Sequence, residues 1–135
     1  MKPRILVADD DADLREILHL ALVRDYDVIE AADGDQAVAR AIDSDPSLIL
    51  LDVRMPGTDG FDVCRRLKSD RRTLGVPIII MSGQGDRRAR ADVLQIGAED
   101  YLYKPLHLRS LRERVRTMIQ MRDINALFNA GASPH

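Results

Sequence analysis

The sequence predicts an α/β fold, with a five-stranded parallel sheet covered by helices on both faces. Short apolar runs of strand length alternate five times with longer segments of helical periodicity. The runs are apolar at nearly every position, which is typical of strands buried on both faces of a parallel sheet. Such alternation requires right-handed crossovers that lay the helices on the sheet. The 135 residues suit one compact domain, which we place at residues 1–120.

Five segments have the composition of buried strands. The first, residues 5–8, runs directly into three consecutive aspartates, Asp9 to Asp11, and the third, residues 48–51, ends at Asp52. Turn-forming residues bound the other runs. The predicted strands are near residues 4–9, 26–30, 47–52, 76–81 and 100–103.

Between the strands lie segments with apolar residues at three- and four-residue spacing, as in amphipathic helices. In the first of them, Asp13 followed three residues later by Glu16 predicts a capping box at the helix start, and Asp11 is also expected to serve in capping. The segment 86–96 has only a thin apolar stripe, which predicts a weakly held helix. The predicted helices are near residues 13–24, 35–43, 60–69 and 86–96, with a last one from about 107.

The last helix is longer than the sheet requires. Covering one sheet takes roughly three turns, but apolar residues continue at helical spacing as far as Phe128. We therefore expect residues 121–135 to form a helical extension with a frayed tail. The extension is either a linker helix or a dimer seam.

The composition excludes several classes of protein. Lys and Arg number 20 and Asp and Glu 22, so the formal net charge is −2 and nothing global favours nucleic acid or an anionic membrane. Hydrophobic residues make up 45%, which excludes a disordered chain. The N-terminal segment has the pattern of neither a signal peptide nor a membrane span. The single cysteine, Cys64, permits no internal disulfide, so we expect a cytoplasmic protein with an inert core thiol.

Acidic residues gather where two strands are predicted to end. Because the carboxyl ends of parallel strands meet at one edge of a sheet, Asp9, Asp10 and Asp52 are expected to lie together. So much negative charge in one pocket requires a cation, and hard divalent ions such as Mg²⁺ prefer oxygen ligands. The sequence therefore predicts a magnesium site, in which Mn²⁺ could substitute.

Four motifs follow predicted strands in order along the chain. They are the pair Asp9-Asp10, the segment LDVRMPGTDG that contains Asp52, the segment MSG around Ser82, and the segment GAEDYLYKP that contains Lys104. With these motifs, the chain from residue 4 to about 120 resembles the CheY-like receiver domain of two-component response regulators. The resemblance implies a flavodoxin-like (βα)5 fold with strand order 2-1-3-4-5.

The resemblance also implies a role for each residue at this edge. Asp52 is the expected nucleophile, which takes a phosphoryl group from a phosphohistidine. Asp9, Asp10 and Asp52 are expected to hold Mg²⁺ together with the backbone carbonyl of Arg54, Asp10 more directly than Asp9. Lys104 is expected to offer its ammonium to a phosphoryl oxygen. A cis peptide bond is expected between this lysine and the proline that follows it.

Ser82 and Tyr101 are the switch residues that the resemblance implies. The Ser82 hydroxyl would move toward a phosphoryl oxygen, and Tyr101 would swing into the space that Ser82 leaves. This movement would alter the face made by the helix 86–96, the strand 100–103 and the last helix. The altered face would then control an output domain or a partner.

The expected phosphodonor is a sensor histidine kinase or a phosphotransfer protein. A receiver homodimer through the face just described, or through the extended last helix, is a further expectation. We expect no direct contact with nucleic acid or a membrane. Leu106 stands where many DNA-binding response regulators have Phe, which disfavours that subclass. The chain is expected to be a signalling switch that catalyses only its own phosphorylation and dephosphorylation, and not an enzyme.

The main alternative is a Mg²⁺-dependent phosphohydrolase with an aspartyl nucleophile. Such enzymes usually have Asp-x-Asp-x-Thr or Val after a strand, and the run that begins at Asp9 lacks the final residue of this pattern. A flavin-binding flavodoxin is disfavoured because three aspartates would repel its phosphate. A degenerate receiver used only for docking is disfavoured because the five side chains expected to act at the site are all present. These are Asp9, Asp10, Asp52, Ser82 and Lys104.

Overall fold

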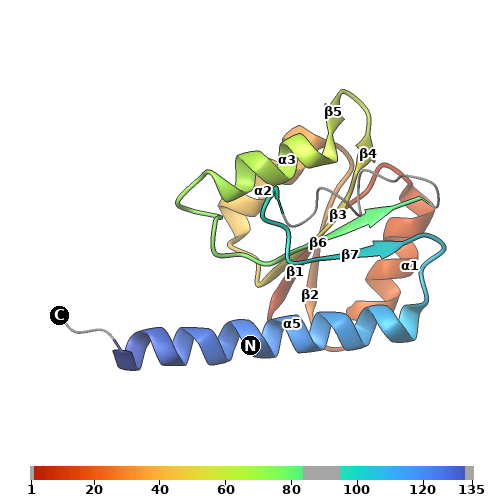
Figure 1. The fold of residues 1–135 in the computed structure, drawn as a ribbon. Helices are drawn as coiled ribbons and strands as arrows, with labels where there is room; N and C mark the ends of the chain where they lie inside the picture. Colours follow the sequence, from red (N-terminus) through yellow and green to blue (C-terminus); the bar gives the residue numbers. More distant parts are fainter. Residues whose placement is uncertain (1, 84–94, 133–135) are drawn as a thin grey trace.

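The computed structural model of the chain describes residues 2–83 and 95–132, of which 129–132 by their backbone alone. Five parallel strands form one sheet in the order β2-β1-β3-β6-β7, with helices on both faces (Figure 1). The strands are β1 (Arg4–Ala8), β2 (Asp27–Ala31), β3 (Leu48–Asp52), β6 (Ile78–Ser82) and β7 (Asp100–Tyr103). The predicted α/β class and parallel sheet are confirmed.

A small antiparallel hairpin, β4 (Arg54–Met55) and β5 (Thr58–Asp59), follows β3 and was not predicted. Each of its strands has two residues, too few to give a recognisable alternating pattern. Gly57 at its turn has a φ of 74°, a conformation that glycine adopts without steric cost. Apart from the two labels that the hairpin takes, the strand order is the expected 2-1-3-4-5.

Two cores, one on each face of the sheet, explain the continuous apolar strands. In β3, Leu48 and Leu50 belong to the core under α1 and α5, and Ile49 and Leu51 to the core under α2 and α3. All four side chains are fully buried, and each such burial contributes about 1.5–3 kcal/mol. The helices are α1 (Ala12–Leu22), α2 (Gly34–Ser44), α3 (Gly60–Lys68) and α5 (Leu108–Ala132).

Asp11 caps helix α1, so the predicted capping box at Asp13 and Glu16 is wrong. The Asp11 carboxylate accepts hydrogen bonds from the backbone N–H of Asp13 at 3.0 Å and of Leu14 at 3.3 Å. Asp13 instead lies in the first turn, where its negative charge interacts favourably with the positive end of the helix dipole. The helix therefore begins closer to the end of β1 than expected.

The predicted helix at 86–96 lies outside the described residues except at its last two positions. Helix α5 has 25 residues, which confirms the long last helix. Within the described side chains of α5, Ile119 is the last buried one, and four large apolar side chains beyond it are 50–73% exposed. These are Met121, Ile124, Leu127 and Phe128. Figure 1 shows the end of α5 extending past the sheet. Across the part of the chain that the structure describes, no helix has the length and apolar character needed to cross a membrane.

Gly60, the first residue of α3, packs directly against the backbone at the end of β3. Its N–H donates a hydrogen bond to the carbonyl of Val53 at 2.8 Å. A Cβ at Gly60 would collide with the carbonyl oxygen of Asp52 and would lie 2.5 Å from the Cα of Val53. Because both obstacles are backbone atoms, they cannot move aside as a flexible side chain would. Only glycine allows α3 to begin so close to Asp52.

The substitution Gly60→Ala should lower the free energy of unfolding by about 1–3 kcal/mol, because inserting atoms into a packed region typically costs this much. Gly75→Ala is the matched control, since a Cβ there would have nothing within 4 Å. Urea unfolding of the three proteins measures the difference. Equal stability of the two variants would contradict the close approach at Gly60.

Candidate functional site

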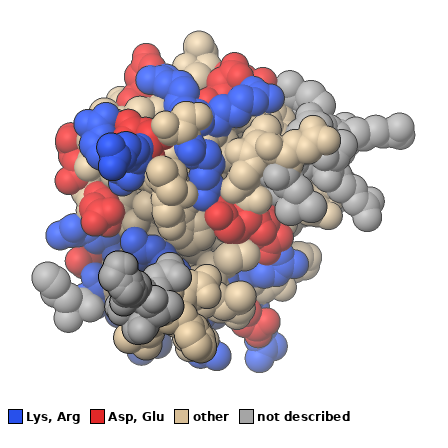
Figure 2. All heavy atoms as spheres, turned by 60° about the vertical axis from the view of Figure 1, so that its left-hand side comes forward, with Lys and Arg blue, Asp and Glu red and all other residues tan. Residues whose placement is uncertain are grey.

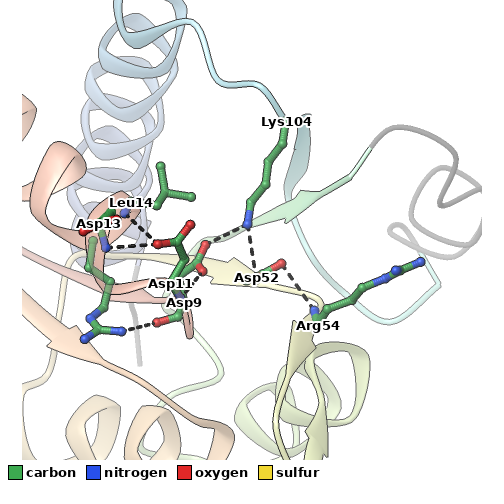
Figure 3. Close-up of polar contacts among 8 residues, drawn as sticks. Asp9, Asp11, Asp13, Leu14, Asp52, Arg54 and Lys104 are labelled. Carbon is green, nitrogen blue, oxygen red and sulfur yellow. Dashed lines mark hydrogen bonds and ion pairs between the residues drawn. The ribbon is translucent and has the colours of Figure 1, made fainter.

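The polar residues predicted to meet at one edge of the sheet do meet there. Asp9 follows β1, Asp52 ends β3, Ser82 ends β6 and Lys104 follows β7. Parallel pairing of these four strands brings their carboxyl ends together. Figure 3 shows the side chain of Lys104 reaching toward Asp9 and Asp52. The sheet topology therefore assembles residues that are as much as 95 positions apart.

Lys104 joins the two buried carboxylates of the site. Its Nζ lies 2.9 Å from Oδ2 of Asp9 and 3.3 Å from Oδ2 of Asp52. Asp9 has no exposed surface and Asp52 is 4% exposed, so each carboxylate would be costly to bury without a partner of opposite charge. The peptide bond between Lys104 and Pro105 is cis, as expected.

The three acidic residues form a compact cluster. Asp9, Asp10 and Asp52 each contribute a carboxylate oxygen to a group whose members all lie within 4.8 Å of one another. Lys104 supplies one positive charge to this cluster, which leaves excess negative charge at the edge of the sheet. Three carboxylate ligands with an exposed member, Asp10, fit Mg²⁺, which prefers oxygen ligands and keeps several waters. The residues present therefore fit the ion that the sequence predicted.

The environment of Asp52 changes its acidity. Burial, and next the negative charge of Asp9, raise the pKa of Asp52 from 3.8 to about 6. The charge of Lys104 and the hydrogen bond from the backbone N–H of Arg54 partly oppose this rise. Burial tends to lower the pKa of Lys104, but its hydrogen bond to Asp9 and the charges of Asp52 and Asp9 outweigh burial and raise it. At neutral pH the lysine is a cation and most of Asp52 is ionised.

Ser82 and Tyr101 occupy adjacent strands beside this cluster. The Oγ of Ser82 is buried and has no hydrogen-bond partner among the residues that the structure describes. Buried polar atoms are normally paired, so this hydroxyl is free to bond a group that enters the site. Tyr101 is half-buried against the core under α2 and α3, and its ring lies 5.4 Å from that of Tyr103 in an edge-to-face arrangement.

The backbone of Arg54 lies beside the Asp52 side chain, and the N–H of Arg54 donates a hydrogen bond to Oδ1 of Asp52 at 3.3 Å. Figure 3 shows this contact at the start of the hairpin that follows β3. The expected role of the Arg54 carbonyl as a metal ligand remains a prediction. Cys64 is buried, and burial raises its pKa to about 11, so the thiol stays protonated at neutral pH.

Sequence reasoning missed one contact with the site. Arg15 of α1 donates a hydrogen bond from Nη1 to the backbone carbonyl of Asp9 at 2.7 Å, and one from Nε to Glu30 of β2 at 3.3 Å. No local pattern joins these positions, since Arg15 and Glu30 approach each other only because β2 pairs with β1. The spacing from the acidic pair to Arg15 gives no signal of its own.

Known proteins share this sequence and fold. The chain is 38% identical over 128 residues to the transcriptional regulatory protein ResD of Bacillus subtilis, covering 94% of this chain and 52% of ResD. The chain thus spans about half the length of the curated relatives it matches.

Solved structures of receiver domains have a similar fold. The signal receiver domain of a signal transduction histidine kinase from Syntrophus aciditrophicus has a TM-score of 0.80 and 29% identity, covering 87% of this chain and 90% of that one. A CheY-like response regulator receiver domain protein from Methanospirillum hungatei has a TM-score of 0.86, covering 93% of this chain and 99% of that one. At 24% identity, the second likeness shows the fold alone.

The family model for the response regulator receiver domain matches residues 5–116. This range contains every polar residue described above at the edge of the sheet, and all of both cores except Met118 and Ile119 of α5. The chain therefore belongs to the response regulator receiver domain family and is the receiver domain of a two-component response regulator.

Proposed function

We propose that this receiver is a reversible phospho-acceptor switch, in which Asp52 takes a phosphoryl group from a sensor histidine kinase or a phosphotransfer protein. One observation supports the assignment above the others. The Asp52 carboxylate lies at a strand end where a lysine and two further carboxylates converge within hydrogen-bonding or ligand distance. Phosphoryl transfer depends on such positioning and charge neutralisation more than on covalent help from the protein.

The transfer is a substitution at phosphorus. A carboxylate oxygen of Asp52 attacks the phosphorus of the donor phosphohistidine, and the phosphorus–nitrogen bond breaks. The electron pair of that bond returns to the imidazole, and Asp52 becomes an acyl phosphate. The carboxylate must be ionised to attack, and a pKa of about 6 leaves it mostly ionised at neutral pH. An acyl phosphate is labile, so the signal can be erased.

Asp9, Asp10 and Asp52, with the backbone carbonyl of Arg54, would hold Mg²⁺ or Mn²⁺. When bound, the ion neutralises charge that develops on the phosphoryl oxygens. Lys104 is already held by Asp9 and Asp52, and its ammonium can turn from these carboxylates to a phosphoryl oxygen. The Lys104 ammonium and the bound ion would thus place two positive groups beside one dianionic phosphoryl group.

The readout of the proposed switch uses Ser82 and Tyr101. A phosphoryl oxygen gives the unpaired Ser82 hydroxyl an acceptor, and movement of Ser82 opens space beside β6 for Tyr101 on β7. The surface near β7 and α5 then changes. Coupling of this kind typically amounts to about 1–3 kcal/mol, which shifts a population between two states.

Lys104→Ala should leave Asp52 able to accept a phosphoryl group, at a reduced rate, but should separate phosphorylation from the surface change. The reason is that no ammonium then draws the phosphoryl group toward β7. Amide chemical shifts of β7 and α5, recorded before and after phosphorylation, measure the coupling. Shifts of wild-type size in the phosphorylated variant would contradict this role of Lys104, and Lys2→Ala serves as the charge-matched control.

The rival function, a Mg²⁺-dependent phosphohydrolase, makes a different prediction from the same site. A switch phosphorylates itself once per Asp52 and does not turn over a pool of small phosphoesters. The test is a colorimetric phosphate assay on small phosphoesters beside mass spectrometry of the protein after incubation with acetyl phosphate. Stoichiometric labelling with no sustained phosphate release supports the switch, and sustained release supports the hydrolase.

The proposal gives this chain no direct contact with DNA. Its formal net charge is −2, and on the face drawn in Figure 2 basic and acidic side chains are interspersed. Proteins that bind DNA through its phosphate backbone instead have Lys and Arg clustered on one surface. Control of an output domain or partner through the surface near β7 and α5 remains part of the proposal.

A receiver homodimer is the second part of the proposal, through the extension of α5 beyond Ile119. Met121, Ile124 and Phe128 are exposed and follow the alternating spacing of three and four residues that forms a coiled-coil seam. A second copy of the same helix presents the same seam, as twofold symmetry requires.

Ile124→Glu should shift the protein toward monomer in sedimentation equilibrium, whereas Asp123→Asn, on another side of the helix, should not. A wild-type protein that stays monomeric at high concentration would contradict the dimer. A dimer that survives Ile124→Glu would favour the alternative interface formed by the segment 86–96, β7 and α5.

A further inference from the structure

Arg15 contacts the cluster of Asp9, Asp10 and Asp52 through a backbone carbonyl and not through one of its carboxylates. Its Nη1 donates a hydrogen bond to the carbonyl oxygen of Asp9 at 2.7 Å, and its Nε donates to Oε1 of Glu30 at 3.3 Å. The side chain of Arg15 is only 18% exposed. His19, one turn further along α1, places Nδ1 3.4 Å from the other oxygen of Glu30. The guanidinium is therefore fixed between the carboxyl ends of β1 and β2.

These bonds hold the peptide group that joins Asp9 to Asp10. The N–H of Asp9 donates to the carbonyl of Ala31 at 3.0 Å, and the N–H of Asp11 donates to Oδ1 of Asp9 at 2.9 Å. The carbonyl of Asp9, in the same peptide group as the N–H of Asp10, accepts its hydrogen bond from Arg15. The orientation of this peptide decides where the Cα–Cβ bond of Asp10 points.

Asp10 depends on its backbone more than the other two acids do. The carboxylates of Asp9 and Asp52 are buried and bonded to Lys104. Asp10 is exposed, yet a carboxylate oxygen of Asp10 lies within 4.8 Å of those of both other acids. An exposed side chain that nevertheless lies in a repulsive acidic cluster needs a fixed main chain to keep it there.

We propose that Arg15 is a positioning residue for the divalent-ion site, which fixes the peptide between Asp9 and Asp10 and so keeps the Asp10 carboxylate in ligand position. Glu30 acts through Arg15, because it holds the Nε side of the same guanidinium. This inference rests on the proposed function, since it concerns the ion that the phospho-acceptor site would use. Outer-shell partners of this type commonly change metal affinity about 10–100-fold when they are removed.

A simple charge effect predicts the opposite sign. Arg15 carries a positive charge close to the acidic cluster, so its charge alone opposes the binding of a cation. If Arg15 acted only through this charge, neutralising it would tighten Mg²⁺ binding and Arg15→Lys would change nothing. If Arg15 positions Asp10, neutralising it weakens Mg²⁺ binding in spite of the removed charge. The direction of the change therefore separates the two roles.

The experiment is a titration of the metal-free chain with MgCl₂, followed by amide chemical shifts. The variants are Arg15→Gln and Arg15→Lys, with Arg40→Gln as control. Arg40 is exposed on α2, and its replacement changes the net charge by the same amount. We expect the dissociation constant for Mg²⁺ to rise about tenfold in Arg15→Gln. Arg15→Lys should lie between this variant and wild type, because one ammonium cannot reproduce the two-pronged contact.

Urea unfolding without Mg²⁺ separates positioning from general loss of structure, because the titration is interpreted only for variants that remain folded. If Arg15→Gln does not fold, Arg15→Lys provides the test, since it keeps the charge and a weaker Mg²⁺ affinity is still expected. Mg²⁺ affinity equal to or tighter than wild type in the folded variants overturns the inference. Absence of Mg²⁺ binding in the wild type would instead refute the proposed function itself, so the two failures are distinguishable.

Discussion

Asp52→Asn should abolish formation of an acyl phosphate, whether the donor is acetyl phosphate or a phosphorylated kinase. An amide is not a nucleophile at neutral pH, and no other described carboxylate of the cluster is held by both Lys104 and the backbone N–H of Arg54. Incubation with donor and Mg²⁺, followed by intact-protein mass spectrometry, measures the label. Asp35→Asn, at an exposed carboxylate of α2, should be labelled like the wild type. Base-labile label retained on Asp52→Asn would contradict the assignment.

The same substitution should stabilise the fold at neutral pH. The pKa of Asp52 is about 6 in the folded chain against an ordinary value of 3.8, so between these values the folded state binds more protons than the unfolded state. Wild-type stability therefore falls as pH rises from about 4 through 6, and Asp52→Asn lacks this loss. If the whole shift in the pKa of Asp52 appeared as stability, the difference between the two proteins would be roughly 3 kcal/mol. Screening by solvent near Asp10 reduces this difference to about 1–2 kcal/mol.

Urea unfolding without metal at pH 4 and pH 7.5 tests the stability effect. The stability of Asp52→Asn relative to wild type should be greater at pH 7.5 than at pH 4. A variant that is less stable than wild type at pH 7.5 would show that the lysine contact outweighs the repulsion among the acids.

Removal of divalent ions should reduce phosphoryl transfer to Asp52 by roughly a hundredfold or more, since a metal ion commonly contributes several kcal/mol of charge stabilisation. The structural reason is the charge of the site, where the carboxylates of Asp9, Asp10 and Asp52 face the single ammonium of Lys104. An incoming phosphoryl group would add more negative charge to this excess. The rate of labelling by acetyl phosphate in excess EDTA, compared with the rate after MgCl₂ or MnCl₂ is restored, measures the effect.

Two outcomes decide this second prediction. Recovery of the rate with either ion, at unchanged stability of the chain, supports an ion-dependent acceptor. Undiminished labelling in excess chelator would mean that Lys104 alone neutralises the phosphoryl group, and the magnesium site would then have no role in transfer.

The sequence predicted the parts of the site that depend on strand ends. Asp52 and Ser82 each end an apolar run, and a parallel sheet must bring such ends to one edge. Their approach to Asp9 and Lys104 also depends on the strand order, which the resemblance to receiver domains implied. The burial of Asp52 and the closeness of the Asp9 carboxylate, which together raise the pKa of Asp52, needed coordinates, because both depend on how tightly the chain packs at that edge.

Other features escaped prediction for physical reasons that differ. The hairpin after Asp52 is too short for a periodic signal, because each of its strands has only two residues. Capping was expected at both Asp11 and Asp13, and only Asp11 caps α1. Several acids in succession satisfy the same capping preference, so only the geometry chooses among them. The contact between Arg15 and Glu30 joins two elements through the sheet, so no local spacing reveals it.

The most direct test of the phospho-acceptor assignment is to locate the modified residue chemically. An acyl phosphate on aspartate is reduced by borohydride to homoserine, which tandem mass spectrometry identifies by position. After incubation with acetyl phosphate and Mg²⁺, we expect homoserine at position 52 and at neither Asp9 nor Asp10. Homoserine at either of those acids, or none anywhere in a protein that binds Mg²⁺, would contradict the assignment.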